Sequence, residues 1–67
     1  MKRVPVQSSN VRSVGHEGRT LEVEFKTGTL YQFENVHPNT IRGLLKAPSK
    51  GKYLWRNVRG KYPTHKL

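Results

Sequence analysis

Hydrophobic and polar residues alternate most regularly between residues 20 and 34 of the sequence. Leu21, Val23 and Phe25 alternate with charged residues, which is typical of a strand with one buried face. Tyr31 and Phe33 alternate in the same way a few residues later. The pattern therefore predicts two antiparallel strands joined by a short turn.

The length of that turn decides on which face the aromatic side chains lie. A two-residue turn would leave Tyr31 and Phe33 beside the glutamates of the preceding strand, exposed to solvent. A three-residue turn, residues 26–28, pairs Val23 with Tyr31 and puts all the large apolar groups on one face. This turn needs a left-handed residue at its third position, where Gly28 stands. Because burial of an aromatic side chain is worth about 1.5–3 kcal/mol, we predict the three-residue turn.

The segment before this hairpin is less regular. Residues 4–9 are expected to be extended, because Pro5 restrains its neighbours and serines follow. Residues 10–17 are consistent with a strand, but Val11 and Val14 are three positions apart. This spacing breaks strict alternation and predicts a bulge near Ser13.

Helical signals follow the hairpin. Pro38 favours a first helical turn, with His37 or Asn35 near the cap position. Apolar residues at helical spacing continue to Leu45, and Pro48 ends the helix.

A second helix is predicted from about Lys50 to Arg59, capped by Ser49 and ended by Gly60. We therefore predict an α+β fold: a small antiparallel β-meander of about three strands followed by two short helices packed on one sheet face. Residues 1–67 are expected to form a single domain, with its core at about 4–63.

Charge is distributed very unevenly along the chain, whose formal net charge is +9. Residues 1–34 contain five basic residues and all four acidic ones, whereas residues 35–67 contain eight basic residues and no acid. Such asymmetry favours nucleic acid or another anionic surface as a partner. Solubility alone would not require every acid to be absent from one half.

The second helix is expected to present this charge on one side. With Lys52 set at 0° on a helical wheel, Arg56 falls at about 40°, Arg59 at about 340° and Trp55 at about 300°. Trp55 therefore lies at the border of the core and is a candidate for stacking on a base, as is Tyr53. Tyr31 and Phe33 are expected to be mainly core, with an exposed aromatic platform as the alternative. The candidate anion-binding residues are Arg42, Lys46, Ser49, Lys50, Lys52, Arg56, Arg59 and Lys61.

The sequence shows no constellation that indicates catalysis, and we expect no enzymatic activity. Glu22 and Glu24 share a strand face, where a solvated role is favoured over acid–base chemistry. The three histidines are scattered and cysteine is absent, so neither a metal site nor a cofactor is expected. The absence of cysteine fits the cytoplasm. No apolar stretch approaches a membrane span and no signal peptide is expected, so a membrane role is not predicted.

A set of short motifs runs through about residues 4–63: two serines near the start, an aromatic-x-aromatic strand, A-x-S-x-G followed by an aromatic residue, and a basic-G-x-Y end. The residues of these motifs are Ser8, Ser9, Tyr31, Phe33, Ala47, Ser49, Gly51, Tyr53, Arg59, Gly60 and Tyr62. The chain therefore resembles the KTSC domain family, which occurs at the C-terminus of some lysyl-tRNA synthetases and as stand-alone proteins of bacteria and phages. The resemblance implies a small α+β domain, for which RNA binding has been suggested. The family's central pair is usually Tyr-x-Tyr, where this chain has Phe33 as the second residue, and position 55 is often Asn, where this chain has Trp55.

The sequence thus predicts a small basic, non-enzymatic binding module. Its expected ligand is nucleic acid, RNA or single-stranded, and it is expected to be a monomer or a small homo-oligomer. One alternative is a protein-interaction module, such as a phage or bacterial inhibitor that docks on an acidic host protein. A second alternative is a site for a small phosphorylated ligand at the start of the second helix, residues 49–52.

Overall fold

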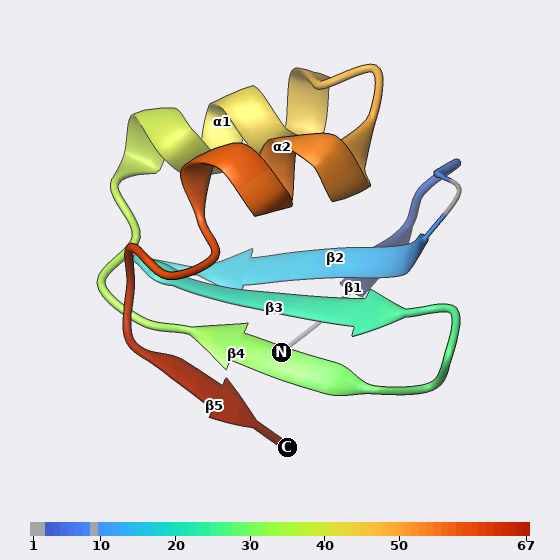
Figure 1. Ribbon diagram of the computed structural model, residues 1–67. Helices are drawn as coiled ribbons and strands as arrows, with labels where there is room; N and C mark the ends of the chain where they lie inside the picture. The colour runs from blue at the N-terminus through green and yellow to red at the C-terminus, as the bar shows by residue number, and fades with distance from the viewer. Residues whose placement is uncertain (1–2, 9) are drawn as a thin grey trace.

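The computed structural model describes residues 3–8 and 10–67, and these form two layers, an antiparallel sheet with two helices on one face (Figure 1). The predicted α+β architecture is confirmed. The strands are β1 (Arg3–Pro5), β2 (Val11–Glu17), β3 (Thr20–Phe25), β4 (Leu30–Phe33) and β5 (Thr64–Lys66). The helices α1 (Pro38–Lys46) and α2 (Lys50–Asn57) come between β4 and β5.

The sheet has five strands in the described residues, not about three, and their order is β1-β2-β3-β4-β5. The two strands that the sequence analysis missed are the edge strands β1 and β5, each three residues long. A segment of three residues is too short to show a periodic pattern. In addition, β5 pairs with β4 only after the chain has passed through both helices.

The hairpin between β3 and β4 has the predicted three-residue turn. Val23 pairs with Tyr31 and Leu21 pairs with Phe33. The turn closes with a hydrogen bond from the Phe25 amide to the Thr29 carbonyl, 2.9 Å long, and Gly28 has a φ of +91°. The large apolar groups of both strands therefore share the face that carries the helices.

The predicted bulge in β2 is also present. The pairing of β2 with β3 shifts between Val11 and Ser13, so Arg12 is the extra residue. This shift allows Val11 and Val14 to reach the same side of the sheet, and both are buried.

Both helices begin as predicted. The His37 ring nitrogen Nδ1 accepts a hydrogen bond from the Asn39 amide (3.1 Å), and Ser49 Oγ accepts one from the Lys52 amide (3.4 Å). The end of α2 comes earlier than predicted, at Asn57, and Gly60 with its φ of +78° follows in the turn beyond. Arg59 consequently lies just after the helix.

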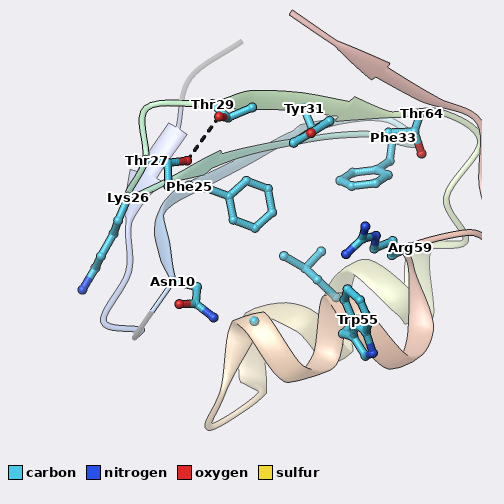
Figure 2. Close-up of a pocket in the computed structure, with 12 residues that line it drawn as sticks. Asn10, Phe25, Lys26, Thr27, Thr29, Tyr31, Phe33, Trp55, Arg59 and Thr64 are labelled. Carbon is cyan, nitrogen blue, oxygen red and sulfur yellow. Dashed lines mark hydrogen bonds between the residues drawn. The ribbon is translucent and has the colours of Figure 1, made fainter.

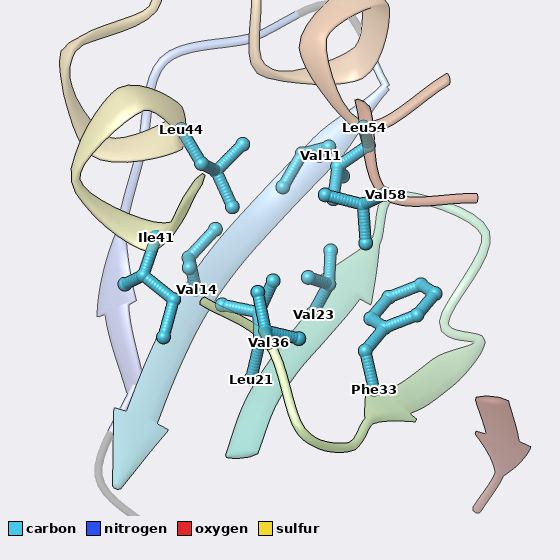
Figure 3. Packing of buried hydrophobic residues seen from close by; sticks show 10 residues of the cluster. All are labelled: Val11, Val14, Leu21, Val23, Phe33, Val36, Ile41, Leu44, Leu54 and Val58. Atoms are coloured by element: carbon cyan, nitrogen blue, oxygen red, sulfur yellow. The ribbon is translucent and has the colours of Figure 1, made fainter. Parts of the chain in front are cut away.

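The hydrophobic core lies between the helices and the β2–β4 part of the sheet (Figure 3). The sheet and the segment that leaves it supply small and medium apolar groups, and each helix inserts residues of its apolar face. The buried residues are Val11, Val14, Leu21, Val23, Phe33, Val36, Ile41, Leu44, Leu54 and Val58.

The opposite face of the sheet corrects one expectation. Glu22 was expected to be solvated, yet it is only 7% exposed. Arg3 Nη1 donates to Glu22 Oε2 at 3.0 Å, and Ser13 Oγ donates to Glu24 Oε1 at 3.0 Å. The missed strand β1 supplies Arg3, because its pairing with β2 places Arg3 opposite Gly15, the partner of Glu22 in β3.

Candidate nucleic-acid interface

An open groove lies between α2 and the β3–β5 part of the sheet (Figure 2). Its volume is about 560 Å³, within the range of about 300–1,000 Å³ that is common for ligand sites. Phe25, Tyr31 and Phe33 form its sheet side, and Leu54, Trp55 and Arg59 come from the α2 side. We call this cavity the aromatic groove.

The three aromatic rings of the sheet contact one another along the groove. The rings of Phe25 and Tyr31 meet edge to face with centroids 5.7 Å apart. Tyr31 and Phe33 are 6.4 Å apart and inclined by 29°. Phe33 belongs to the core as predicted, whereas Tyr31 and Phe25 are half-buried. Tyr31 therefore combines both predicted roles, since it packs against the core and also lines the groove.

On the α2 side, Trp55 is the most prominent group, because 65% of its surface is exposed. The guanidinium carbon of Arg59 lies 4.2 Å from the centroid of the indole ring, in a cation–π arrangement. This contact fixes a positive charge directly beside an exposed aromatic surface.

A smaller, more open depression adjoins the groove at Trp55. Lys52 and Arg56 line it, together with Asn10, Gly51 and Trp55, which also line the aromatic groove. Three predicted phosphate contacts, Lys52, Arg56 and Arg59, are thus brought together around the predicted stacking residue. We call these four residues the α2 surface.

Other predicted site residues have structural tasks. Lys50 Nζ donates to the carbonyls of Leu45 (3.0 Å) and Ala47 (2.6 Å), so its ammonium satisfies backbone groups at the end of α1. Ser49 caps α2. Tyr53 is half-buried beside α1, where a Cβ at Gly43 would collide with its ring.

The remaining predicted cations line neither depression. Arg42 donates to Asn39 Oδ1 at 2.9 Å on α1. Lys46 lies in the last turn of α1, and Lys61 lies in the turn after α2. All three are exposed.

Sequence analysis missed several polar groups of the groove. Asn10, Lys26, Thr27, Thr29 and Thr64 line it. Lys66 pairs with Tyr31 across the β4–β5 ladder, and directly paired residues share a face of the sheet. The signal that would have found Thr64 and Lys66 is the alternation in β5, which is too short to recognise.

The glutamates do not neutralise the α2 surface. In the part of the chain that the structure describes, the ion pairs are Arg3–Glu22, Arg12–Glu24 and His65–Glu34. None involves a lysine or arginine of residues 35–67. The first two pairs lie on the sheet face away from the helices, because Glu22 and Glu24 alternate with the buried Leu21 and Val23.

Two further kinds of feature are absent from residues 3–8 and 10–67. No cluster of three or more His, Cys, Asp or Glu side chains is arranged to hold a metal ion. No helix is long and apolar enough to cross a membrane.

The fold and the site define a small basic α+β domain, and comparisons with known proteins place it in a family. The KTSC domain family matches residues 7–62, so the chain belongs to this family. A crystal structure of a KTSC domain protein from Yersinia pestis has a TM-score of 0.91 and 32% identity, covering 98% of this chain and 96% of that chain.

Two relatives are similar in sequence. An uncharacterised protein of Stutzerimonas stutzeri is 49% identical over 55 residues, which cover 79% of this chain and 78% of that protein. A lysine–tRNA ligase of Nostoc punctiforme is 30% identical over 63 residues, which cover 91% of this chain but 11% of the ligase.

The motif residues that carry the family resemblance are mainly structural. Beyond the capping role of Ser49 and the packing of Tyr53, the hydroxyl of Tyr62 lies 3.2 Å from that of Thr40 in α1. Gly51 lies beside Asn10, where an added Cβ would make ordinary van der Waals contact at 3.4 Å. Ser9 lies outside the described residues. These roles explain why the motif identifies the fold rather than a ligand.

Proposed function

We propose that this protein is a non-enzymatic module that binds single-stranded nucleic acid, with RNA favoured, through the α2 surface. The observation that carries the proposal is the position of Lys52, Arg56 and Arg59 around an exposed indole, where none of them is paired with an acid of the described residues. Phosphates would be bound by these cations, and Trp55 offers a ring on which a base can stack.

The shape of the surface favours a single strand over a duplex. In a duplex the faces of the bases are stacked on one another, so an indole can reach a base face only where a strand is unpaired. The helix α2 is only eight residues long, and its cations lie around Trp55. It therefore differs from the recognition helices that enter the major groove of duplex DNA and contact base edges. RNA is favoured because one relative is a lysine–tRNA ligase. The cytoplasm is the compartment that we propose for this activity.

The test is a titration of the protein with a fluorescently labelled oligouridylate at several salt concentrations. If Lys52, Arg56, Arg59 and one peripheral cation each contact a phosphate, log affinity should fall with log salt at a slope of about −2.8 for a single strand. Single-stranded DNA and duplex DNA of equal length serve as comparisons, with the duplex expected to bind more weakly. A salt-independent affinity would contradict the proposal and favour docking on a protein.

A further inference from the structure

We propose that the aromatic groove is a pocket for an unpaired nucleobase, so that one base of the bound strand leaves the α2 surface and enters between α2 and the sheet. This inference rests on the proposed function and extends it. The binding of phosphates by α2 does not require the groove, so the two claims can fail separately.

The lining of the groove fits a flat, polar-edged aromatic ligand. Its floor consists of rings from Phe25, Tyr31 and Phe33, and the α2 side is lined by Trp55 with the Arg59 guanidinium over its indole (Figure 2). Base–aromatic stacking tolerates any base, because every base has a π-face. A purely aliphatic ligand could be buried against these rings, but it would neither stack on them nor hydrogen-bond the polar rim.

Polar groups stand at the rim, where the edge of a base or a ribose would lie. The hydroxyls of Thr27 and Thr29 are 3.2 Å apart at the hairpin turn, where Thr27 is exposed and Thr29 is half-buried. Thr64 and the Asn10 side chain add further donors and acceptors at the rim. Such groups can hydrogen-bond an unstacked base, which exposes its Watson–Crick edge.

The cations near the aromatic groove favour a ligand that carries negative charge. Lys52 and Arg56 line the depression that shares Asn10, Gly51 and Trp55 with the groove, and Arg59 lies on the indole itself. At the sheet side, Lys26 lines the groove and Lys66 is paired with Tyr31. When a base of a nucleic-acid strand enters the groove, the phosphates that flank this base can therefore contact cations from α2 and from the sheet. An apolar peptide segment would leave these charges without partners.

The first experiment uses the unmodified protein and two ligands with the same number of phosphates. One is an oligouridylate, and the other is an abasic strand of equal length. We expect the abasic strand to bind about fivefold or more weakly, the smallest effect typical of one stacked base. The protein contains one tryptophan, Trp55, so its fluorescence reports base stacking directly. Oligouridylate should quench it and the abasic strand should not.

The second experiment separates the groove from Trp55 alone. Tyr31→Leu removes a ring from the groove floor but keeps an apolar group, and Tyr53→Leu is the matched change at a half-buried tyrosine outside the groove. Tyr31→Leu should weaken oligouridylate binding about fivefold or more and leave abasic-strand binding unchanged. Tyr53→Leu should change neither. Circular dichroism checks folding, and if Tyr31→Leu does not fold, Phe25→Leu, which removes another half-buried ring from the groove floor, takes its place with the same expected results.

The outcomes are distinct. Equal affinity for the two strands, or an unchanged oligouridylate affinity in folded Tyr31→Leu, would overturn the nucleobase pocket while leaving phosphate binding by α2 intact. Failure of both strands to bind at low salt would remove the proposed function and the pocket together. If oligouridylate binds more tightly than the abasic strand and Tyr31→Leu removes this difference, the result supports both the proposed function and the nucleobase pocket.

Discussion

At the scale of single residues, two lysines of the same helical turn have different tasks. The ammonium of Lys50 points back to the carbonyls of Leu45 and Ala47, whereas Lys52 lines the depression beside Trp55. The sequence gives both residues the same expected role, because a helical wheel does not show that α1 ends within reach of Lys50. The contacts of Lys50 therefore distinguish a structural cation from a binding one.

Methionine substitutions at these two positions test that distinction. Lys50→Met removes two charge-assisted hydrogen bonds from a partly exposed site and should lower the free energy of unfolding by about 1 kcal/mol. Lys52→Met should leave the free energy of unfolding within about 0.5 kcal/mol of the parent, since the side chain is exposed. Its affinity for oligouridylate at 0.1 M salt should fall about fivefold, the contribution of one phosphate contact. Urea unfolding measures the free energy of unfolding, and fluorescence anisotropy measures the affinity for oligouridylate. If Lys50→Met lost affinity and Lys52→Met lost stability, the roles given to the two lysines would be wrong.

At the scale of elements, the sequence predicts the parts of the fold whose signal is local. The β3–β4 hairpin, its turn and the bulge in β2 follow from alternation and one glycine, and both helix starts follow from capping residues. The edge strands could not be predicted in this way, because each is only three residues long. In addition, the position of β5 depends on its pairing with β4, which lies about thirty residues earlier in the chain. The α2 cations and Trp55 are predictable from the helical period. The groove is not, since it depends on β5 and on how far α2 lies from the sheet.

Gly28 allows the three-residue turn between β3 and β4, and this turn sets the register that places the rings of Tyr31 and Phe33 in the aromatic groove. Gly28→Ala should lower the free energy of unfolding by about 1–2 kcal/mol, because a side chain disfavours the left-handed conformation that its φ of +91° requires. Nothing lies near the added methyl group, so a steric clash does not contribute. Thr27→Ala, at the neighbouring exposed position, is the control and should change the free energy of unfolding by less than about 0.5 kcal/mol. Urea denaturation of the three proteins checks this, and equal stability of Gly28→Ala and the parent would contradict it.

At the scale of the whole molecule, the two faces of the sheet divide the charge. Glu22 and Glu24 lie on the face without helices and are paired there with Arg3 and Arg12. The helices cover the other face and come from the acid-free half of the sequence. Folding therefore keeps Glu22 and Glu24 away from the cations of α2, which remain available to a ligand.

Two charge reversals distinguish this local surface from net charge alone. Arg56→Glu and Arg19→Glu each lower the net charge by two, but Arg56 lines the depression beside Trp55, whereas Arg19 lies at the β2–β3 turn and lines neither cavity. Both side chains are exposed, so both variants should fold. Arg56→Glu should weaken oligouridylate binding at 0.1 M salt by about tenfold or more and make the slope against log salt shallower by about 0.7. Arg19→Glu should cost less than about threefold, because a charge outside the contact acts only through the screened field of the whole protein. Equal losses in anisotropy titrations of the two variants would mean that the strand is attracted by total charge and that α2 is not its binding surface.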